Sequence, residues 1–374
     1  MATHAAELIP VTAAKRKLVR RTTPDNSQRI RHAVQLAFVA LNAWLGIQFY
    51  LWARFFERGG AGLRVPRPAG AEGWLPIAGL MNFKAFVTTG RFPVIHPAAM
   101  FLFMAFVGMS MIAKKSFCSW LCPVGTFSEF LAGLGKKLFR RNLRLPRWLD
   151  LPLRGLKYLL LGFFVFIIVS MSAAAIEEFM ATPYGIIADV KMLNFFRNMS
   201  GTALIVIAAL VALSILVENF WCRYLCPYGA LMGLVSLLSP LKIRRNASAC
   251  VDCGKCSRAC PSSLPVDKLL QIRSVECTAC MACIASCSSE DALRFSLPQG
   301  RMPVAAGEPT LTPVAALPRF RRAVTPLAMV GILAMIFFGM ILVARATNHW
   351  QTHVPQSVYQ ELVPNANQAT HPGY

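Results

Sequence analysis

The chain is poor in charged residues, and acidic residues are especially scarce. Only 15% of its 374 residues are charged, with 17 acidic residues against 39 basic ones. Because 55% of the residues are hydrophobic and the mean hydropathy is +0.49, the composition argues against a soluble protein and predicts a membrane protein. The first thirty residues lack the apolar run of a cleavable signal peptide, so none is expected.

Motifs for several cofactors are missing. No Cys-x-x-Cys-His sequence occurs, which excludes c-type haem. None of the six histidines lies deep in an apolar segment, which argues against a b-type haem held between helices. No GxGxxG follows a predicted strand, so neither a resident NAD domain nor a flavin domain is expected. The sequence therefore shows no hydride chemistry of its own.

Five apolar segments are long enough to cross a bilayer. They predict an all-α polytopic membrane protein with about five transmembrane helices, over residues 33–52, 97–113, 158–176, 202–217 and 327–344. The fourth segment is short, and it could extend through Phe220 and Trp221.

The basic residues predict the orientation in the membrane. Residues 15–32, 114–157 and 222–322 hold 7, 10 and 13 Lys or Arg, which is 30 of the 39. The positive-inside rule makes these segments cytoplasmic, with the N-terminus inside and the C-terminus outside. We expect such basic segments to meet anionic headgroups of the lipid bilayer, and we expect no nucleic-acid partner.

Eight of the twelve cysteines form two runs with the spacing CxxCxxCxxxC. The runs are Cys250, Cys253, Cys256 and Cys260, followed by Cys277, Cys280, Cys283 and Cys287. This is the ligand pattern of a bacterial two-cluster ferredoxin, in which the fourth cysteine of each run ligates the other cluster. The spacing predicts two 4Fe-4S clusters, one held by Cys250, Cys253, Cys256 and Cys287 and the other by Cys277, Cys280, Cys283 and Cys260.

Zinc and disulfides fit these cysteines less well. Zinc sites usually separate two CxxC pairs by a longer loop, and a disulfide framework needs an oxidising compartment. All twelve cysteines fall in predicted cytoplasmic segments or at cytoplasmic helix ends, which suits thiolate ligands for iron. The second run has Ser288 after its last cysteine where the first has Pro261, a change that could tune the potential without removing a ligand.

The other four cysteines belong to an internal repeat. Residues 117–125 match residues 221–229, and each copy places a CxxxCP sequence at the end of a predicted helix hairpin. Four thiols brought together there could hold a further metal or cluster, form a dithiol redox pair, or dock the ferredoxin domain. The remaining interpretation is that these cysteines have no chemical role and only pack as small side chains. The candidate redox thiols are Cys118, Cys122, Cys222 and Cys226.

These features divide the chain into six parts. We expect a basic, disordered cytoplasmic tail at 1–30, a membrane domain of four helices in two hairpins at 31–240, a small cytoplasmic α+β ferredoxin-type domain at 241–296, a linker at 297–323, a fifth transmembrane helix at 324–345, and a polar outer tail at 346–374. The helical spacing of apolar residues in 124–150 predicts an amphipathic helix on the inner leaflet. The apolar stretch 74–81 is too short to span and is expected to be a loop packed on the bundle's outer end.

A few ionisable residues lie near the predicted membrane surfaces. Glu218, just before Cys222, is interpreted as a solvated carboxylate at a helix end. His96, Glu177, Glu178 and Asp189 are predicted at the outer surface as ordinary interfacial residues, with a proton exit for quinol as the alternative.

At these motifs the chain resembles the membrane polyferredoxins with CxxxCP repeats, the group of the NapH quinol-dehydrogenase subunits, NosR and the cupric reductase CcoG. The likeness lies in residues 72–82, in 118–125, in 222–233 and in the two ferredoxin runs. It implies a multi-pass protein of the bacterial inner membrane with two cytoplasmic 4Fe-4S clusters and a periplasmic C-terminus. The chain departs from NosR in lacking an outer flavin-binding domain and from CcoG in having only a short outer tail, so neither partner assignment transfers.

The predicted function is electron transfer through the two clusters, between a membrane or periplasmic partner and a cytoplasmic one. Quinone or quinol is the candidate on the membrane side. We expect an electron carrier or a subunit of an oxidoreductase system rather than a complete enzyme. The alternative is a metal reductase acting on Cu(II), or an assembly or regulatory factor, that uses the CxxxCP thiols, since thiolates suit Cu(I). The direction of electron flow stays open.

Overall fold

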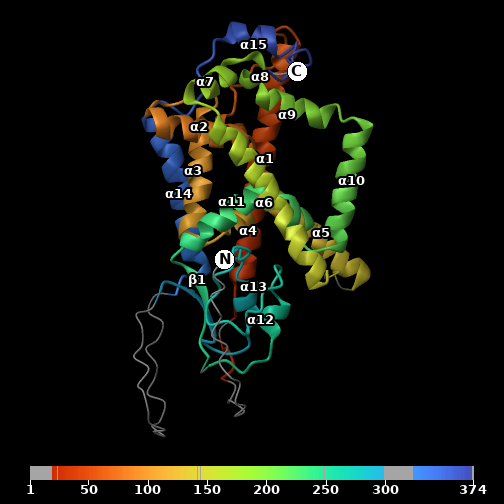
Figure 1. Ribbon diagram of the computed structural model, residues 1–374, viewed down its shortest axis with the longest axis vertical. Coiled ribbons are helices and arrows are strands. Elements are labelled where there is room, and N and C mark those ends of the chain that lie inside the picture. The colour runs from red at the N-terminus through yellow and green to blue at the C-terminus, as the bar shows by residue number, and fades with distance from the viewer. Residues whose placement is uncertain are drawn as a thin grey trace.

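The computed structural model describes residues 19–372, except 23, 141, 144, 248 and 299–322. Long helices run along the molecule, and the segment that carries the two ferredoxin runs lies at one end of them (Figure 1). We call residues 241–296 the ferredoxin module, the end of the bundle beside it the module end, and the opposite end the distal end.

Three helices are long and apolar enough to cross a membrane by themselves, α1 (Ser27–Glu57), α6 (Arg147–Ser170) and α14 (Pro326–Ala346). A fourth span needs α9 (Ala188–Arg197) and α10 (Gly201–Leu216) together, and these two helices are bent by 82° where they meet. The predicted second span, α3 (Pro97–Ala113), is apolar but has only 17 residues. Within the described residues, length and hydropathy therefore support three or four spans.

Two predicted span boundaries are wrong. The third span does not continue to Ile176, because α6 ends at Ser170 and the hydroxyl of Ser172 caps a new helix, α7 (Ala173–Ala181). The fourth span does not extend through Phe220. The chain leaves α10 in an extended conformation at Val217, and Asn219 then adopts a left-handed conformation with φ of 57°.

The distal end is built from short helices and from the last described residues of the chain. They are η1 (Ala69–Trp74), α2 (Pro76–Thr89), α7, α8 (Pro183–Ile186), α9 and α15 (Gln356–Leu362). The expected loop at 74–81 is therefore largely helical, since residues 76–81 begin the 14-residue helix α2, which packs on α3. The polar tail is also structured. Tyr359 of α15 packs its ring against Trp52 at a centroid distance of 5.1 Å, so the tail closes over the end of α1.

Each CxxxCP sequence forms a short helical turn followed by a second helix. The first copy forms α4 (Ser116–Trp120) and α5 (Pro123–Phe139), and the second forms η2 (Trp221–Leu225), α11 (Pro227–Val235) and the short η3 (Ser236–Leu238). The two copies interlock, because α5 packs on α10 of the second hairpin while α11 packs on α3 of the first. Contact between α5 and α10 is close: a Cβ at Gly135 would lie 1.9 Å from the carbonyl oxygen of Ile215.

The helix α5 has the amphipathic character expected of residues 124–150, but it ends at Phe139, and residues 147–150 already belong to α6. Its exposed large apolar side chains follow helical spacing, and they are Phe127, Phe130, Leu134 and Leu138. This face is free to contact lipid.

The ferredoxin module contains two short antiparallel strands and two one-turn helices. Strand β1 (Lys242–Arg245) pairs with β2 (Leu293–Ser296), so that Ile243 lies opposite Phe295 and both are buried. The helices are α12 (Lys255–Arg258) and α13 (Ala282–Ala285). The described part of the basic tail is not disordered. The backbone N–H groups of Glu290 and Arg21 donate to the carbonyls of Val19 and Ser288, so residues 19–21 lie along the module.

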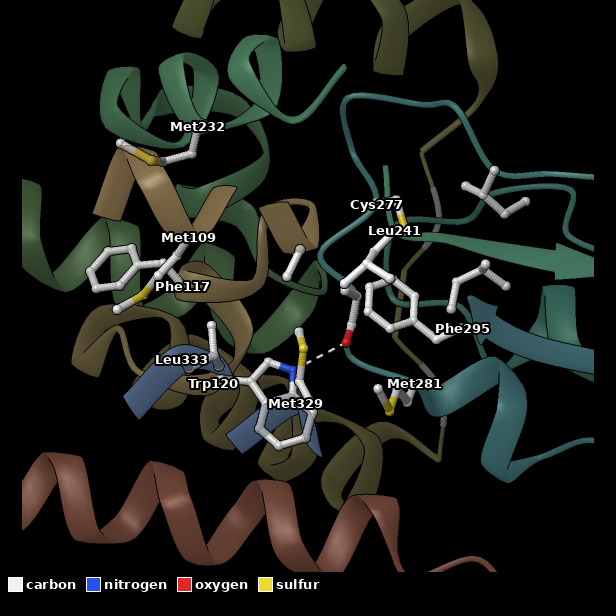
Figure 2. Packing of buried hydrophobic residues seen from close by; sticks show 14 of the residues in the cluster. Met109, Phe117, Trp120, Met232, Leu241, Cys277, Met281, Phe295, Met329 and Leu333 are labelled. Atoms are coloured by element: carbon white, nitrogen blue, oxygen red, sulfur yellow. Dashed lines mark hydrogen bonds between the residues drawn. The ribbon is translucent and has the colours of Figure 1, made fainter. Parts of the chain in front are cut away.

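One hydrophobic core runs through both the bundle and the module. Figure 2 shows side chains of the bundle meeting those of the module, with Met109, Phe117, Trp120, Met232, Met329 and Leu333 on one side and Leu241, Cys277, Met281 and Phe295 on the other. Because buried area is shared, the module is fixed on the bundle and does not hang from it on a flexible tether.

A buried ionic cluster holds the distal end together. The Arg67 guanidinium lies 2.8 Å from a Glu72 oxygen and 2.5 Å from an Asp189 oxygen. Nδ1 of His96 lies 3.3 Å from Glu72, and the hydroxyl of Thr352 donates to Glu72 at 2.7 Å. Burial alone would raise the pKa of Glu72, but the Arg67 charge and the His96 contact outweigh it and lower the pKa to about 2.

This cluster corrects two predictions from the sequence. His96 and Asp189 were expected among solvated interfacial residues, yet both are buried. Glu177 and Glu178 are exposed, as predicted. The buried pair was missed because its main partners, Arg67 and Glu72, stand in a loop and a short helix that show no hydrophobic periodicity.

We expect Glu72→Gln to lower the midpoint of thermal unfolding in detergent, because it leaves the buried Arg67 with one anionic partner fewer. Breaking a buried pair costs about 3 kcal/mol. The exposed Glu178→Gln is the control and should leave the midpoint unchanged. The folded-state pKa of Glu72 is depressed, so its contribution is present above the usual value of 4.5 and is lost as the pH falls towards 2. A midpoint difference that persists at pH 2, or none at pH 7, would contradict this assignment.

Candidate functional site

The eight ferredoxin cysteines gather into two groups of four. Cys250, Cys253, Cys256 and Cys287 line one small cavity of the module. Cys260, Cys277, Cys280 and Cys283 line a second. The fourth cysteine of each run thus lies with the first three of the other run, which is the arrangement that the sequence predicts. All twelve cysteines of the chain lie in the described residues, and all are free thiols.

Local backbone geometry turns these cysteines inward. The residue before each one-turn helix, Gly254 before α12 and Met281 before α13, adopts a left-handed conformation, with φ of 68° and 59°. Each turn brings the third cysteine of its run, Cys256 or Cys283, into the core, where both are buried.

The environment of the second group suits iron ligation. Burial raises the pKa of Cys277 to about 11, and it raises the pKa of Cys283 as well. Thiols in such surroundings become thiolates when a cation neutralises them, as iron does. Four converging thiols in an apolar cavity therefore fit a 4Fe-4S cluster, and each of the two cavities offers such a set.

The four CxxxCP cysteines lie together at the module end of a large cavity inside the helix bundle. The cavity has a volume of about 640 Å³ and is lined mainly by apolar side chains, among them Phe38, Phe106 and Phe337. All four thiols, Cys118, Cys122, Cys222 and Cys226, belong to its lining. Burial raises the pKa of Cys118 to about 12, and neighbouring cysteines add to the effect.

The second cysteine of each copy stands at the N-cap position of the helix that follows it. Cys122 is the N-cap of α5 and Cys226 that of α11, where the N–H of Gly229 donates to the Cys226 sulfur at 3.2 Å. Such N–H groups favour the thiolate. The glycine of the first copy is needed for space, because a Cβ at Gly125 would lie 2.2 Å from the carbonyl oxygen of Cys118.

A buried cation lies beside these thiols. Lys115 is 3% exposed, and its ammonium is 3.8 Å from the carboxylate of Glu276 in the module. Burial lowers the pKa of Lys115, but its interactions with the Cys118 thiol and the Glu276 carboxylate outweigh it and raise the pKa overall. Lys157 of α6 approaches the other oxygen of Glu276 at 2.5 Å. The carboxylate that precedes Cys277 is therefore held by two lysines of the bundle.

Hydrogen bonds attach the loop of the second cysteine run directly to α4. The hydroxyl of Ser119 donates to the Thr278 carbonyl at 2.6 Å, and Nε1 of Trp120 donates to the Ala279 carbonyl at 3.1 Å (Figure 2). From α1, the Gln28 amide donates to the Cys280 carbonyl at 2.9 Å. The first CxxxCP turn thus docks the module, which was one of the three roles left open by the sequence.

A second, polar cavity lies between the CxxxCP turns and the module. It measures about 220 Å³, and Lys115, Cys118 and Cys222 line both this cavity and the large apolar one. Cys280 of the module lines it as well. Glu218, expected to be a solvated carboxylate, also lines it and forms an ion pair of 2.8 Å with Lys136.

Among the described residues, no group of three or more His, Cys, Asp or Glu side chains is arranged to hold a single metal ion. The sequence also missed Lys115, Glu276 and Tyr228 as parts of the site. Only Tyr228 carried a signal, because it stands directly after the CxxxCP sequence where the first copy has Val124, and it lines the apolar cavity beside the thiols.

Comparison with known families agrees with this geometry. The family of the 4Fe-4S binding domain matches residues 95–146 and 199–246, which include both CxxxCP copies. The family of the 4Fe-4S dicluster domain matches residues 242–288, which include both ferredoxin runs. No solved structure was found to be similar to the chain.

Several known proteins are similar to the chain. YccM of Escherichia coli (strain K12), whose name assigns it to electron transport, is 49% identical over 92% of this chain and 93% of its own length. The ferredoxin-type protein NapH of Haemophilus influenzae is 28% identical over 54% of this chain and 68% of its own. The methylamine utilization ferredoxin-type protein MauN of Paracoccus denitrificans is 29% identical over 45% of this chain and 56% of its own. The chain therefore belongs to the membrane polyferredoxins, iron–sulfur proteins of electron transport.

Proposed function

We propose that this protein transfers electrons between quinone or quinol in the membrane and a redox partner in the cytoplasm, by way of two 4Fe-4S clusters in the ferredoxin module. One observation carries the proposal. The turn that lines the apolar membrane cavity with Cys118 also holds, through Ser119 and Trp120, the loop of the second cysteine run.

The apolar cavity has the chemistry of a quinone site. Its walls of aromatic and aliphatic side chains suit an isoprenoid tail, and pockets of 300–1,000 Å³ are typical for ligands of this size. At its module end, Lys115 and Tyr228 could donate hydrogen bonds to a quinone oxygen beside the thiols. A headgroup held there lies next to the module.

In the module, we propose that Cys250, Cys253, Cys256 and Cys287 hold one cluster and that Cys277, Cys280, Cys283 and Cys260 hold the other. Such clusters accept and release single electrons. The chain's own residues position the clusters relative to the membrane. The second group lies against α4, so it is the one nearer to the membrane cysteines, and Lys115 and Lys157 hold the loop at Glu276.

We propose that the four CxxxCP cysteines form the membrane end of this electron path. Their convergence on one cavity and the N-cap positions of Cys122 and Cys226 support a redox role, either as thiols or as ligands of a further cluster.

The proposal also includes the orientation. The basic residues at the module end favour a multi-pass protein of the bacterial inner membrane with the module in the cytoplasm, the distal end in the periplasm and five spans including the short α3. Electrons could flow in either direction, set by the potentials of the partners.

We expect added quinone to oxidise the reduced clusters of the purified protein in lipid nanodiscs, or quinol to reduce the oxidised ones, followed by EPR. Ile341→Trp narrows the cavity and should weaken the apparent quinone affinity about tenfold, since overpacking costs about 1–3 kcal/mol. Leu342→Trp, on the neighbouring residue that is 68% exposed, is the matched control. If neither quinone nor quinol exchanges electrons with the clusters, the proposed function is wrong.

The crossed ligand sets make a separate prediction. Cys260→Ser should change the EPR signal of the same cluster as Cys277→Ser, although the two residues belong to different runs. Cys256→Ser should change the other signal, together with Cys287→Ser. Pairing of Cys260 with Cys256 would instead mean that each run holds its own cluster.

Metal content tests the role of the membrane cysteines. We expect about eight irons per chain and no stoichiometric copper after anaerobic purification. The double variant Cys118→Ser, Cys222→Ser should keep that iron but slow electron exchange with quinone. If the unmodified protein holds about four further irons that this variant lacks, the membrane cysteines bind a third cluster. If it holds stoichiometric copper that this variant lacks, the copper reductase becomes the favoured function.

A further inference from the structure

The apolar membrane cavity and the polar cavity behind it share one wall. Both cavities are lined by Lys115, Cys118 and Cys222. A ligand bound at the module end of the apolar cavity is therefore separated from the polar cavity by a single layer of side chains. A quinone site needs a nearby route for protons, because quinone takes up two protons with its two electrons and quinol releases them.

The polar cavity leads to solvent on the module side. Three of its lining side chains, His32, Glu129 and Lys136, are 55%, 39% and 53% exposed. The charged groups that face it come from every surrounding element, with Arg31 from α1, Glu218 after α10 and Glu276 from the module. A cavity of 220 Å³ with these polar partners is large enough to hold water that can carry protons.

The distal end offers a poorer route. The buried Arg67 cluster lies beyond the far end of α3, and 17 residues at 1.5 Å each put about 25 Å between the two ends of this helix. The apolar cavity is lined in part by Phe106, Phe337 and Ile341, and Arg67, Gln48 and Gln351 also line it, so the distal route is much longer than the module-side route although it is not wholly apolar.

We propose that the polar cavity is the proton route of the quinone reaction, so that protons and electrons are exchanged on the same side of the membrane. The inference rests on the proposed quinone reaction. In the direction of quinone reduction, one quinone takes two electrons, one from each reduced cluster, and two protons from the module side, and becomes one quinol. Turnover then moves no net charge across the membrane.

The test uses the full-length protein in sealed lipid vesicles. Membrane-impermeant dithionite reduces only the modules that face outward, and it is then removed by anaerobic gel filtration. A short-chain quinone is added, and the medium pH, a trapped pH dye and a potential-sensitive dye are recorded with the cluster absorbance. We expect two protons to leave the medium per quinone reduced, with no change in the lumen and no membrane potential.

Proton uptake from the lumen, or a membrane potential, would overturn the inference while leaving the quinone reaction intact. Clusters that stay reduced would instead refute the proposed function. Glu218→Leu places an apolar side chain in the polar cavity and should slow cluster oxidation several-fold. Glu57→Leu, which breaks the comparable ion pair with Arg197 at the distal end, should not. Equal rates in these two variants would exclude the polar cavity as the route.

Discussion

The position of the cysteine groups relative to the two cavities depends on one contact, the packing of the ferredoxin module against the first CxxxCP turn. The ring of Trp120 is fully buried, and its only polar atom donates to the carbonyl of Ala279, 159 residues away. Around it, the shared hydrophobic core removes apolar area of both parts from water or lipid. If this contact were lost, the second cysteine group would separate from the membrane thiols, and the two cavities would no longer share a wall.

Electrostatics reinforces the same contact. Glu276 is 7% exposed and would be costly to bury alone, but Lys115 and Lys157 of the bundle neutralise it. Each of these lysines would in turn be costly without the carboxylate. Charge balance is therefore reached only when module and bundle are joined, which makes the docked state specific as well as stable. The Arg67 cluster applies the same principle at the distal end.

Much of this could be predicted from the sequence, because the relevant signals are local. Apolar runs predicted the positions of the long helices, and cysteine spacing predicted which thiols converge in the module. The helix breaks at Ser172 and Asn219 depend on caps and backbone conformations that average hydropathy hides. Pairs such as Lys115 with Glu276 lie far apart in the chain, and no periodicity marks them. For that reason the sequence predicted the thiols but not the buried charges around them.

The interlocked repeats explain why the membrane thiols converge. Because α5 of the first copy packs on α10 of the second hairpin, and α11 packs back on α3, the two CxxxCP turns are held close to each other. The two copies are not equivalent, however. The first carries Trp120 and docks the module, whereas the second places Tyr228 at the apolar cavity, where the first has Val124. Both copies line the apolar cavity, but only the first also holds the loop of the second cysteine run, so the first turn joins the cavity to the module.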